Sequence, residues 1–407
     1  MKNTEADGKV RRIWTALTGI VLVALLISGC GGIGPTTVKV VVSLPLSQEY
    51  AQDMLHATQL ALKNANGKAG NVNVQILALS YSNPNGGDIS ADLARQDAEQ
   101  AVKDTSIVAF LGPDYTSLAK VSIPILNTAS ITQIASTVTW PGLTKPGYGP
   151  GEPGIYYPTG GRTFFRTVPS DEVQGAAGAR WVVQLGYKST YIVHGTGSYE
   201  QGVAGVFELT AKDLGINILG DDTFPIDGTI APAQLETIVS KVIAANPDMV
   251  YLAGNYGNNG EVVARALREA NATLPIMVPD GLQVDDFINT LGANLADNIY
   301  GTTPSLPADK LDTPAAAAFL SSYQAAYNKK PSAFDTATYE AMNVLLDAIK
   351  RAKQPTRQGV LDAMRNLGDY SGVLGTWHFD EQGDISLAWI SGMQVQKGAW
   401  VFVQALK

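Results

Sequence analysis

The chain contains few of the residues that most catalytic and metal sites use. Cysteine occurs once, at Cys30, so no disulfide can form within the chain. The three histidines, His56, His194 and His378, are far apart and match no metal-ligand spacing. There is no G-x-S-x-G elbow and no Walker A loop. We therefore expect no catalytic residues, no metal site and no cofactor.

A dinucleotide loop is also missing. The stretch "HGTGSYEQG" (194–202) contains G-x-G, but Glu200 occupies the place of the third glycine of that fingerprint.

Charge is low and of one sign. Charged residues make up 16% of the 407, and the formal net charge is −8. The first 29 residues hold four Lys/Arg and two Asp/Glu, which leaves 25 and 35 in the remainder, a formal charge of −10. A surface that acidic repels phosphate backbones, so we expect no nucleic-acid partner. With 45% hydrophobic residues the chain can bury a full core, and its length suggests about two domains.

The N-terminus carries an export pattern. Basic "KVRR" (9–12) precedes the apolar run 13–28, which is shorter than the roughly 18 residues of a membrane-spanning helix. The following "LISGC" resembles a bacterial lipobox, in which the cysteine is lipidated and becomes the new N-terminus. This predicts a lipoprotein signal peptide over 1–30, lipidation of Cys30, a tether over 31–37 and an extracytoplasmic protein anchored to the bacterial membrane. The alternative is a signal anchor with an incidental thiol.

Beyond the tether, strand and helix patterns alternate. Valine- and isoleucine-rich runs such as 37–46, 72–81 and 106–113 are separated by amphipathic stretches, and a second alternating block covers 189–281. Such alternation predicts parallel sheets covered on both faces, here two doubly wound lobes. The Pro/Gly-rich stretch 141–163 reads as a long loop. Helices are expected near 313–329, 335–352 and 356–367, and β structure over 375–403.

Ligands of open parallel sheets sit beyond the carboxyl ends of the strands. Hydroxyl residues follow the strands of the first block, including Thr116, Ser117 and Thr137. An aromatic residue and an acid follow strands of the second block, Tyr199 and Asp280. Hydroxyls and backbone N–H groups suit a carboxylate, an aspartate suits an ammonium, and aromatic rings cover an apolar side chain. The set therefore indicates a small zwitterion.

From about residue 38 onward the chain resembles the leucine/isoleucine/valine-type substrate-binding lipoproteins of bacterial ABC transporters, which have the type I periplasmic-binding fold. The likeness is carried by "FFRTVPSDEVQGAAGARWV" (164–182), by "GTWHFDEQGD" (375–384), by "VPDG" (278–281) and by the lipobox. The resemblance implies one lobe of 38–165 plus 304–375, a second of 166–303 plus 376–407, and a hinge between them.

The resemblance also implies roles for individual residues. Thr116 and Ser117 would hold the ligand carboxylate, although the two could merely cap a helix. Asp280 would pair with the ligand ammonium, although P-D-G is also a common turn. Six further residues complete the implied site: Thr137, Thr139, Tyr199, Tyr50, Asn255 and Tyr256. Trp140, next to Thr139, adds to the aromatic residues at the mouth of the site.

Some positions depart from the family pattern. Asp114 and Tyr115 stand where relatives have small or hydroxyl residues, and an acid there repels a carboxylate unless it points outward. Asn255 stands where many relatives place a second cleft tyrosine. These departures leave the ligand open among branched-chain and other small amino acids and amide-like solutes.

The expected function is capture of such a solute and its delivery to an ABC permease with its ATPase, by a monomer that performs no covalent chemistry. A sensor of the same fold, a lipid-anchored hydrolase and an adhesin are the rivals.

Overall fold

The computed structural model describes residues 36–83, 89–292 and 294–406, which belong to one compact unit. Cys30, the signal peptide and most of the tether lie outside the described residues. Within them, no helix combines the length and the apolar character that crossing a membrane requires.

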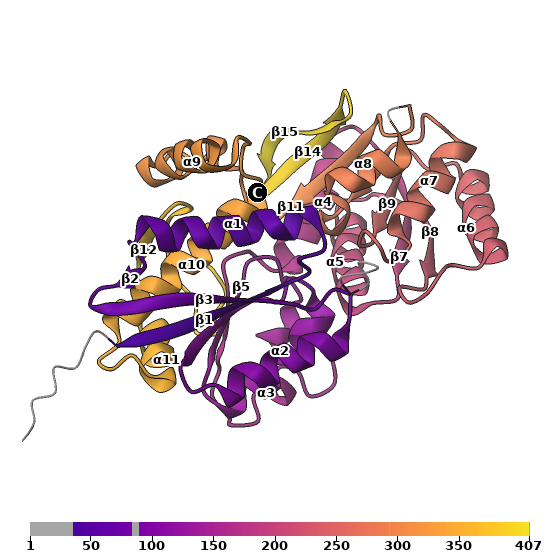
Figure 1. Ribbon diagram of the computed structural model, residues 1–407. Coiled ribbons are helices and arrows are strands. Elements are labelled where there is room, and N and C mark those ends of the chain that lie inside the picture. Colours follow the sequence, from indigo (N-terminus) through magenta and orange to yellow (C-terminus); the bar gives the residue numbers. More distant parts are fainter. Residues whose placement is uncertain (1–35, 84–88, 293, 407) are drawn as a thin grey trace, which may run out of the picture. The chain divides into compact units, whose positions relative to one another are not determined.

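The first sheet has six strands in the order β2-β3-β1-β4-β5-β6 (Figure 1). All neighbours are parallel except the short β2, which is antiparallel to β3. The strands are β1 (Thr37–Leu44), β2 (Lys68–Ala69), β3 (Val72–Ser80), β4 (Ile107–Leu111), β5 (Thr132–Ala135) and β6 (Phe164–Arg166).

Helices cover both faces of this sheet, as its apolar strands require. Val40 and Val42 of β1 pack in the core that α1, α10 and α11 close, whereas Val41 points to the opposite face, toward α2 and α3. The helices are α1 (Glu49–Asn64), α2 (Ala91–Lys103), α3 (Thr116–Thr128), α9 (Pro314–Tyr327), α10 (Ala333–Arg351) and α11 (Arg357–Arg365). The last three match the helices predicted late in the sequence, so residues far along the chain complete the first core.

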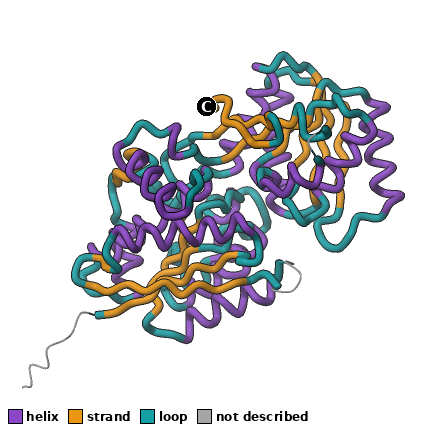
Figure 2. Tube along the Cα trace, turned by 45° about the horizontal axis from the view of Figure 1, so that its top comes forward, coloured by secondary structure: helices purple, strands orange, loops and turns teal. Residues whose placement is uncertain are grey.

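The second sheet has seven strands in the order β15-β14-β11-β10-β9-β7-β8, and Figure 2 shows it as a separate group of strands with its own helices. Five of its strands, β8, β7, β9, β10 and β11, are parallel to one another. At one edge, the antiparallel hairpin β14–β15 pairs with β11. The strands are β7 (Ser189–Gly195), β8 (Asn217–Phe224), β9 (Met249–Ala253), β10 (Ile276–Val278), β11 (Ile299–Thr303), β14 (Ile390–Gln396) and β15 (Ala399–Leu406).

Alternation along β9 again divides the side chains between two helical layers. Val250 and Leu252 pack with α6, α7 and α8, while Met249 and Tyr251 pack with α4 and α5. The helices are α4 (Asp171–Gln184), α5 (Ser198–Asp213), α6 (Pro232–Ala245), α7 (Gly260–Ala270) and α8 (Asp285–Leu291). The α/β architecture with two mostly parallel sheets, predicted from the alternating pattern, is confirmed.

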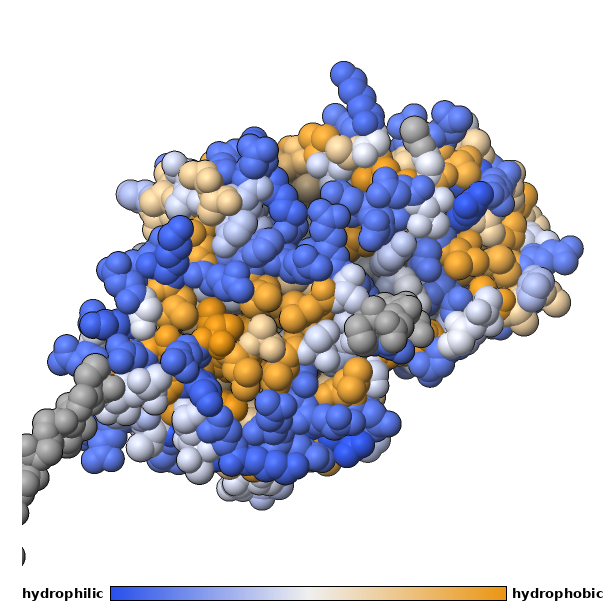
Figure 3. Space-filling view, viewed as in Figure 1, coloured by the Kyte–Doolittle hydropathy of each residue, from blue (hydrophilic) through white to orange (hydrophobic). Residues whose placement is uncertain are grey.

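Short elements fill the connections. The Pro/Gly-rich stretch 141–163 contains two single-turn 3₁₀ helices, η1 (Pro141–Leu143) and η2 (Gly154–Tyr156). Two others, η3 (Asp280–Leu282) and η4 (Ala308–Lys310), follow β10 and β11, and the hairpin of β12 (Tyr370–Gly372) and β13 (Gly375–Trp377) precedes β14. Figure 3 shows apolar side chains at the surface over β1 and β3, where Ile76, Leu77 and Leu79 are half-buried.

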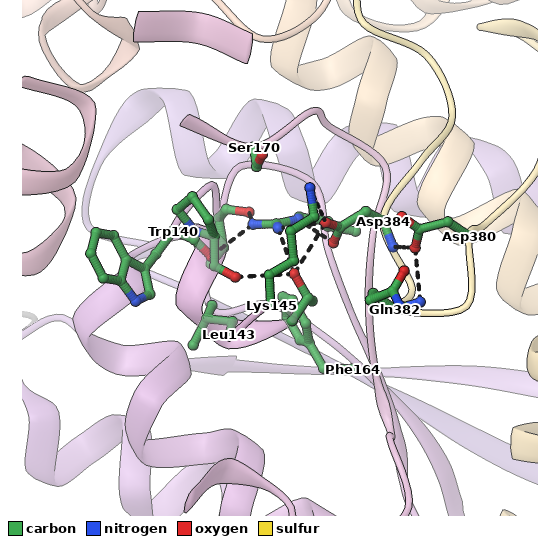
Figure 4. A network of polar contacts seen from close by, with 12 residues as sticks. Trp140, Leu143, Lys145, Phe164, Ser170, Asp380, Gln382 and Asp384 are labelled. Carbon is green, nitrogen blue, oxygen red and sulfur yellow. Dashed lines mark hydrogen bonds and ion pairs between the residues drawn. The ribbon is translucent and has the colours of Figure 1, made fainter. Parts of the chain in front are cut away.

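A buried ion pair ties the end of β6 to the segment that precedes β14. The guanidinium of Arg166 donates to both carboxylate oxygens of Asp384, at 2.8 and 3.0 Å, and also to the backbone oxygen of Trp140 at 3.0 Å. Figure 4 shows Trp140, Lys145 and Asp384 in this network. Burial opposes ionisation of Asp384, but the charges of Arg166 and Lys145 and the hydrogen bonds from Arg166 and Thr144 together outweigh it and hold the pKa of Asp384 below its ordinary value. Two stretches that the sequence separates by more than 200 residues are thereby fixed together.

Candidate functional site

Residues from the ends of strands in both sheets line one cavity of about 430 Å³. From the first sheet come the segments after β1, β4 and β5, and from the second sheet come those after β7, β8, β9 and β10. The loop between α9 and α10 closes a further side. Parallel strands place their carboxyl ends together, which is why seven separate strand-end segments meet here.

Eight of the nine residues expected to hold a ligand line this cavity: Tyr50, Thr116, Ser117, Thr137, Tyr199, Asn255, Tyr256 and Asp280. Thr139 is the exception among the described residues. It is fully buried, and its backbone oxygen accepts the N–H of Asp171 at the start of α4, at 3.0 Å. The loop after β5 therefore presents Thr137 to the cavity and turns Thr139 into the interior. Trp140 does not line the cavity either.

Asp280 follows the apolar strand β10 after Pro279, and the residue is only 6% exposed. Its Oδ1 accepts the Tyr199 hydroxyl and the amide of Gln174, both at 2.7 Å. The other carboxylate oxygen, Oδ2, accepts no hydrogen bond from another described residue. No described lysine, arginine or histidine forms an ion pair with Asp280. Burial raises the pKa of Asp280 to about 6, although these two hydrogen bonds favour its ionised form. The carboxylate is thus held in place without a positive partner.

The residue after Asp280 is a glycine because a side chain at this position would collide with neighbouring atoms. A Cβ at Gly281 would lie 2.3 Å from the side-chain oxygen of Asn255 and 2.6 Å from the backbone oxygen of Gly254. The Gly281 N–H also donates to the Tyr199 hydroxyl at 3.0 Å. The "PDG" stretch therefore forms a turn, η3, and also places the Asp280 carboxylate on the cavity wall. The two interpretations that the sequence left open, a turn and a ligand-binding acid, are compatible.

Thr116 and Ser117 form the first turn of α3, but neither is its capping residue. The N-cap is Tyr115, whose side chain caps nothing, and the first turn contains no acid. The backbone oxygen of Tyr115 accepts the N–H groups of Leu118 and Ala119, which leaves those of Thr116 and Ser117 without a backbone partner in the described chain. Together with the Thr116 hydroxyl, these two N–H groups are donors suited to binding an anion at the positive end of the helix dipole.

Asp114 faces the cavity rather than bulk solvent. Its Oδ2 accepts the hydroxyl of Tyr50 at 2.7 Å and its Oδ1 accepts that of Tyr81. The hydroxyl of Thr137 donates to its backbone oxygen at 3.0 Å. Burial raises the pKa of Asp114 to about 7, against the effect of the Tyr50 hydrogen bond. Its direction depends on tyrosines from two other segments.

Sequence reasoning missed several cavity residues. Glu200 is 2% exposed and accepts the amide of Asn255 at 2.5 Å, and burial raises the pKa of its carboxyl. Asp53 on α1, and Lys329 and Asp335 near the start of α10, also line the cavity. Asp53 lies one helical turn from Tyr50, which is the spacing that could have indicated it. The α9–α10 residues follow no strand, so the strand-end criterion could not find them.

Carboxylates dominate the charges on the cavity wall. Lys329 and Lys330 are its basic residues, and its acids are Glu49, Asp53, Asp114, Glu200, Asp280, Asp285, Asp286 and Asp335. No group of three or more His, Cys, Asp or Glu residues in the described ranges is arranged to hold a metal ion.

Two mostly parallel sheets whose strand ends meet at one cavity define the class of type I periplasmic binding proteins. The chain belongs to the periplasmic binding protein family, whose sequence profile matches residues 37–398.

Individual relatives agree with that assignment. A leucine-, isoleucine-, valine-, threonine- and alanine-binding protein of Pseudomonas aeruginosa is 23% identical over 354 residues, which cover 86% of this chain and 87% of that protein. The leucine-binding protein LivK of Thermotoga maritima has a TM-score of 0.77 at 22% identity, covering 91% of this chain and 98% of that one. LivJ of Streptococcus pneumoniae, solved with isoleucine, has a TM-score of 0.74 at 22% identity, covering 90% of this chain and 100% of that one. The resemblance expected from the sequence motifs is confirmed.

Proposed function

We propose that this protein is the extracytoplasmic solute-binding component of an ABC transporter and that it captures an amino acid in the cavity. The relatives named for branched-chain and other small amino acids support this ligand class. One observation carries the proposal for this chain. The buried Asp280 carboxylate and the free N-terminus of α3 line the same cavity, so an ammonium and a carboxylate on one small molecule would each find a complementary group.

The proposed roles follow from this pair. Asp280 would receive the α-ammonium, with Tyr199 and Gln174 holding the carboxylate in position. Thr116 and Ser117 would receive the α-carboxylate through N–H and hydroxyl groups. Four further residues would line the rest of the site: Tyr50, Thr137, Asn255 and Tyr256.

Binding would act through movement of two lobes. The proposed lobes are 38–165 with 304–375, and 166–303 with 376–407. A ligand that contacts both halves at once has a higher affinity for the closed arrangement and shifts the population toward it. The side chain of Lys120, whose Nζ lies 2.9 Å from the Ser198 hydroxyl of the second half, is one contact that such a movement would alter.

The remaining features of the proposal concern the protein's surroundings. Lipidation of Cys30 would anchor the protein to the bacterial membrane. The protein would act as a monomer, and its partners would be a permease and an ATPase. No step of this function needs a catalytic residue. A receptor-coupled sensor of the same fold would use the same cavity, so binding alone does not separate the two.

The test is a thermal-shift screen of the full-length chain, kept in mild detergent, against the twenty amino acids, small amides and organic acids. We expect the melting temperature to rise with at least one α-amino acid, because a ligand of the folded state stabilises it. A screen in which no α-amino acid raises the melting temperature, even at millimolar concentration, would overturn the proposal.

A further inference from the structure

Among the described residues, carboxyl groups outnumber cations at the end of the cavity next to α1. Tyr50 and Asp53 lie one turn apart on the same face of α1, with Asp114 bonded to Tyr50 and Asp335 close enough to Asp53 for their charges to interact. Three carboxylates, Asp53, Asp114 and Asp335, therefore gather around one helical turn. All of them line the cavity.

The lysines of the cavity wall do not balance this group. Lys329 is bound to Asp53 at 2.6 Å and lies 3.5 Å from Glu49, and Lys330 lies 3.4 Å from Asp309. Lys329 is thus paired with Asp53. Among the described residues, Asp114 has only neutral donors, the hydroxyls of Tyr50 and Tyr81.

Asp335 supplies an independent sign that a donor is missing here. The residue is 3% exposed, its Oδ2 accepts the N–H of Ser332 at 2.7 Å, and its Oδ1 is buried without a hydrogen-bond partner among the described residues. A buried carboxylate oxygen without a donor is costly. A branched aliphatic side chain entering this end would displace water from Asp114 and Asp335 and leave both uncompensated.

The position of Asp114 separates this end from the place proposed for the α-carboxylate. Its side chain reaches Tyr50 and Tyr81, which follow β1 and β3, whereas its backbone oxygen is held from the opposite direction by Thr137, which follows β5. Since the sheet order is β3-β1-β4-β5, the Asp114 carboxylate points along the sheet edge toward β3. The free N–H groups of Thr116 and Ser117, at the start of α3, follow Asp114 directly in the chain.

We infer that the cavity takes α-amino acids with a second positive charge on the side chain, such as lysine, ornithine or arginine, and that Asp114 is the partner of that charge. The inference rests on the proposed function and adds the ligand's chemical class to it. Methylene groups between the two charged ends would pack against Met54, Phe334 and the ring of Tyr50. Asp280 and the start of α3 would hold the α-amino acid part.

Isothermal titration with ligands of matched shape tests this inference. Norleucine is lysine without the side-chain amine, and citrulline is arginine with a neutral urea group. For the full-length chain in detergent we expect lysine or arginine to bind at least tenfold more tightly than its neutral counterpart. In Asp114→Asn that ratio should fall to near one, with the affinity for norleucine unchanged or higher. Asp312→Asn, an exposed change of the same charge before α9, should keep the original ratio.

The outcomes separate this inference from the proposed function. If leucine or norleucine binds and none of the basic amino acids binds more tightly, the inference is wrong and the proposed function stands. If no α-amino acid binds, both are wrong. Cadaverine binding as tightly as lysine would overturn the amino-acid class, because the α-carboxylate would then contribute nothing.

A measurement on the unsubstituted protein covers the case in which Asp114→Asn does not fold. The titratable groups facing Asp114 are Tyr50, Tyr81 and Tyr115, and burial keeps the pKa of Tyr50 and Tyr115 above their ordinary values. Burial raises the pKa of both Asp114 and Asp335 to about 7, so these are the two groups at this end of the cavity that change charge near neutrality. Lysine binding at pH 7 should release protons, seen as a binding enthalpy that depends on the buffer's ionisation enthalpy, and norleucine binding should release fewer. Equal proton release for both ligands would contradict the inference.

Discussion

Replacing Asp280 by asparagine tests the proposed ammonium site with little disturbance of its surroundings. The substituted side chain has the same shape, and its oxygen can still accept the Tyr199 hydroxyl and the Gln174 amide that Asp280 accepts at 2.7 Å. What is lost is the negative charge, at a position that is 6% exposed and therefore weakly screened. Removing one partner of a buried charge pair costs about 2–5 kcal/mol of binding free energy.

That range corresponds to a loss of affinity of roughly 30-fold to several thousand-fold. Because both hydrogen bonds to the oxygen can survive, we expect the lower half of the range. The assay is isothermal titration with the amino acid that gives the largest thermal shift, with Asp312→Asn as the charge-matched control. An affinity within about twofold of the original protein would refute the role of Asp280.

The pH dependence of binding follows from the same carboxyl. The pKa of Asp280 is about 6 in the empty cavity, and an ammonium next to it stabilises the ionised form, so the pKa falls when the ligand binds. Binding must therefore displace a proton when the pH lies below about 6. We expect affinity to fall by about tenfold per pH unit below that value and to lose this dependence in Asp280→Asn. Affinity that stays constant from pH 7 to pH 5 would contradict the assignment.

Three further perturbations have definite expected results. Thr116→Ala should weaken ligand binding by about 0.5–1.5 kcal/mol, the value of one hydrogen bond; titration that detects no loss would remove Thr116 from the site. Asp384→Asn should lower the free energy of unfolding by about 3–5 kcal/mol, since it leaves the Arg166 charge buried without its partner; a urea-unfolding midpoint equal to that of the original protein would contradict this. Cys30→Ser should release the protein from the membrane fraction, and continued membrane association on fractionation would count against the lipobox.

Stability of the empty protein should also depend on pH. Burial raises the pKa of Asp171 to about 8 and that of Asp335 to about 7, whereas unfolded aspartates titrate near 3.9. Between these values the folded state holds protons that the unfolded chain releases, so stability falls as the pH rises from about 4 to 8. We expect a lower melting temperature at pH 8 than at pH 5.5 without ligand. A melting temperature that rises over this interval would show that these carboxyls are already ionised in the folded state.

The sequence predicted several of the cavity residues that follow strands, because one rule places them. Thr116, Tyr199, Asn255 and Asp280 each come just after a parallel strand, and such ends meet at one edge of a sheet. The rule depends only on local pattern, so it needed no knowledge of packing. It also succeeded across both sheets, since each is built from the same repeating unit.

The rule does not account for features that depend on contacts between distant segments. Thr139 is turned inward by a bond to Asp171 of α4, which the pattern around residue 139 does not encode. The direction of Asp114 is set by Tyr50 and Tyr81, which lie 64 and 33 residues earlier in the chain. Asp335 reaches the cavity because α10 completes the core of the first sheet from the far end of the sequence. Only the folded structure brings these residues together.

A crystal structure of the chain grown with its best-binding amino acid tests the central claim most directly. We predict one ligand in the cavity, with its α-ammonium nitrogen about 3 Å from an Asp280 oxygen and its α-carboxylate at the N–H groups of Thr116 and Ser117. A ligand bound elsewhere, or bound in this cavity with neither end at these groups, would contradict it.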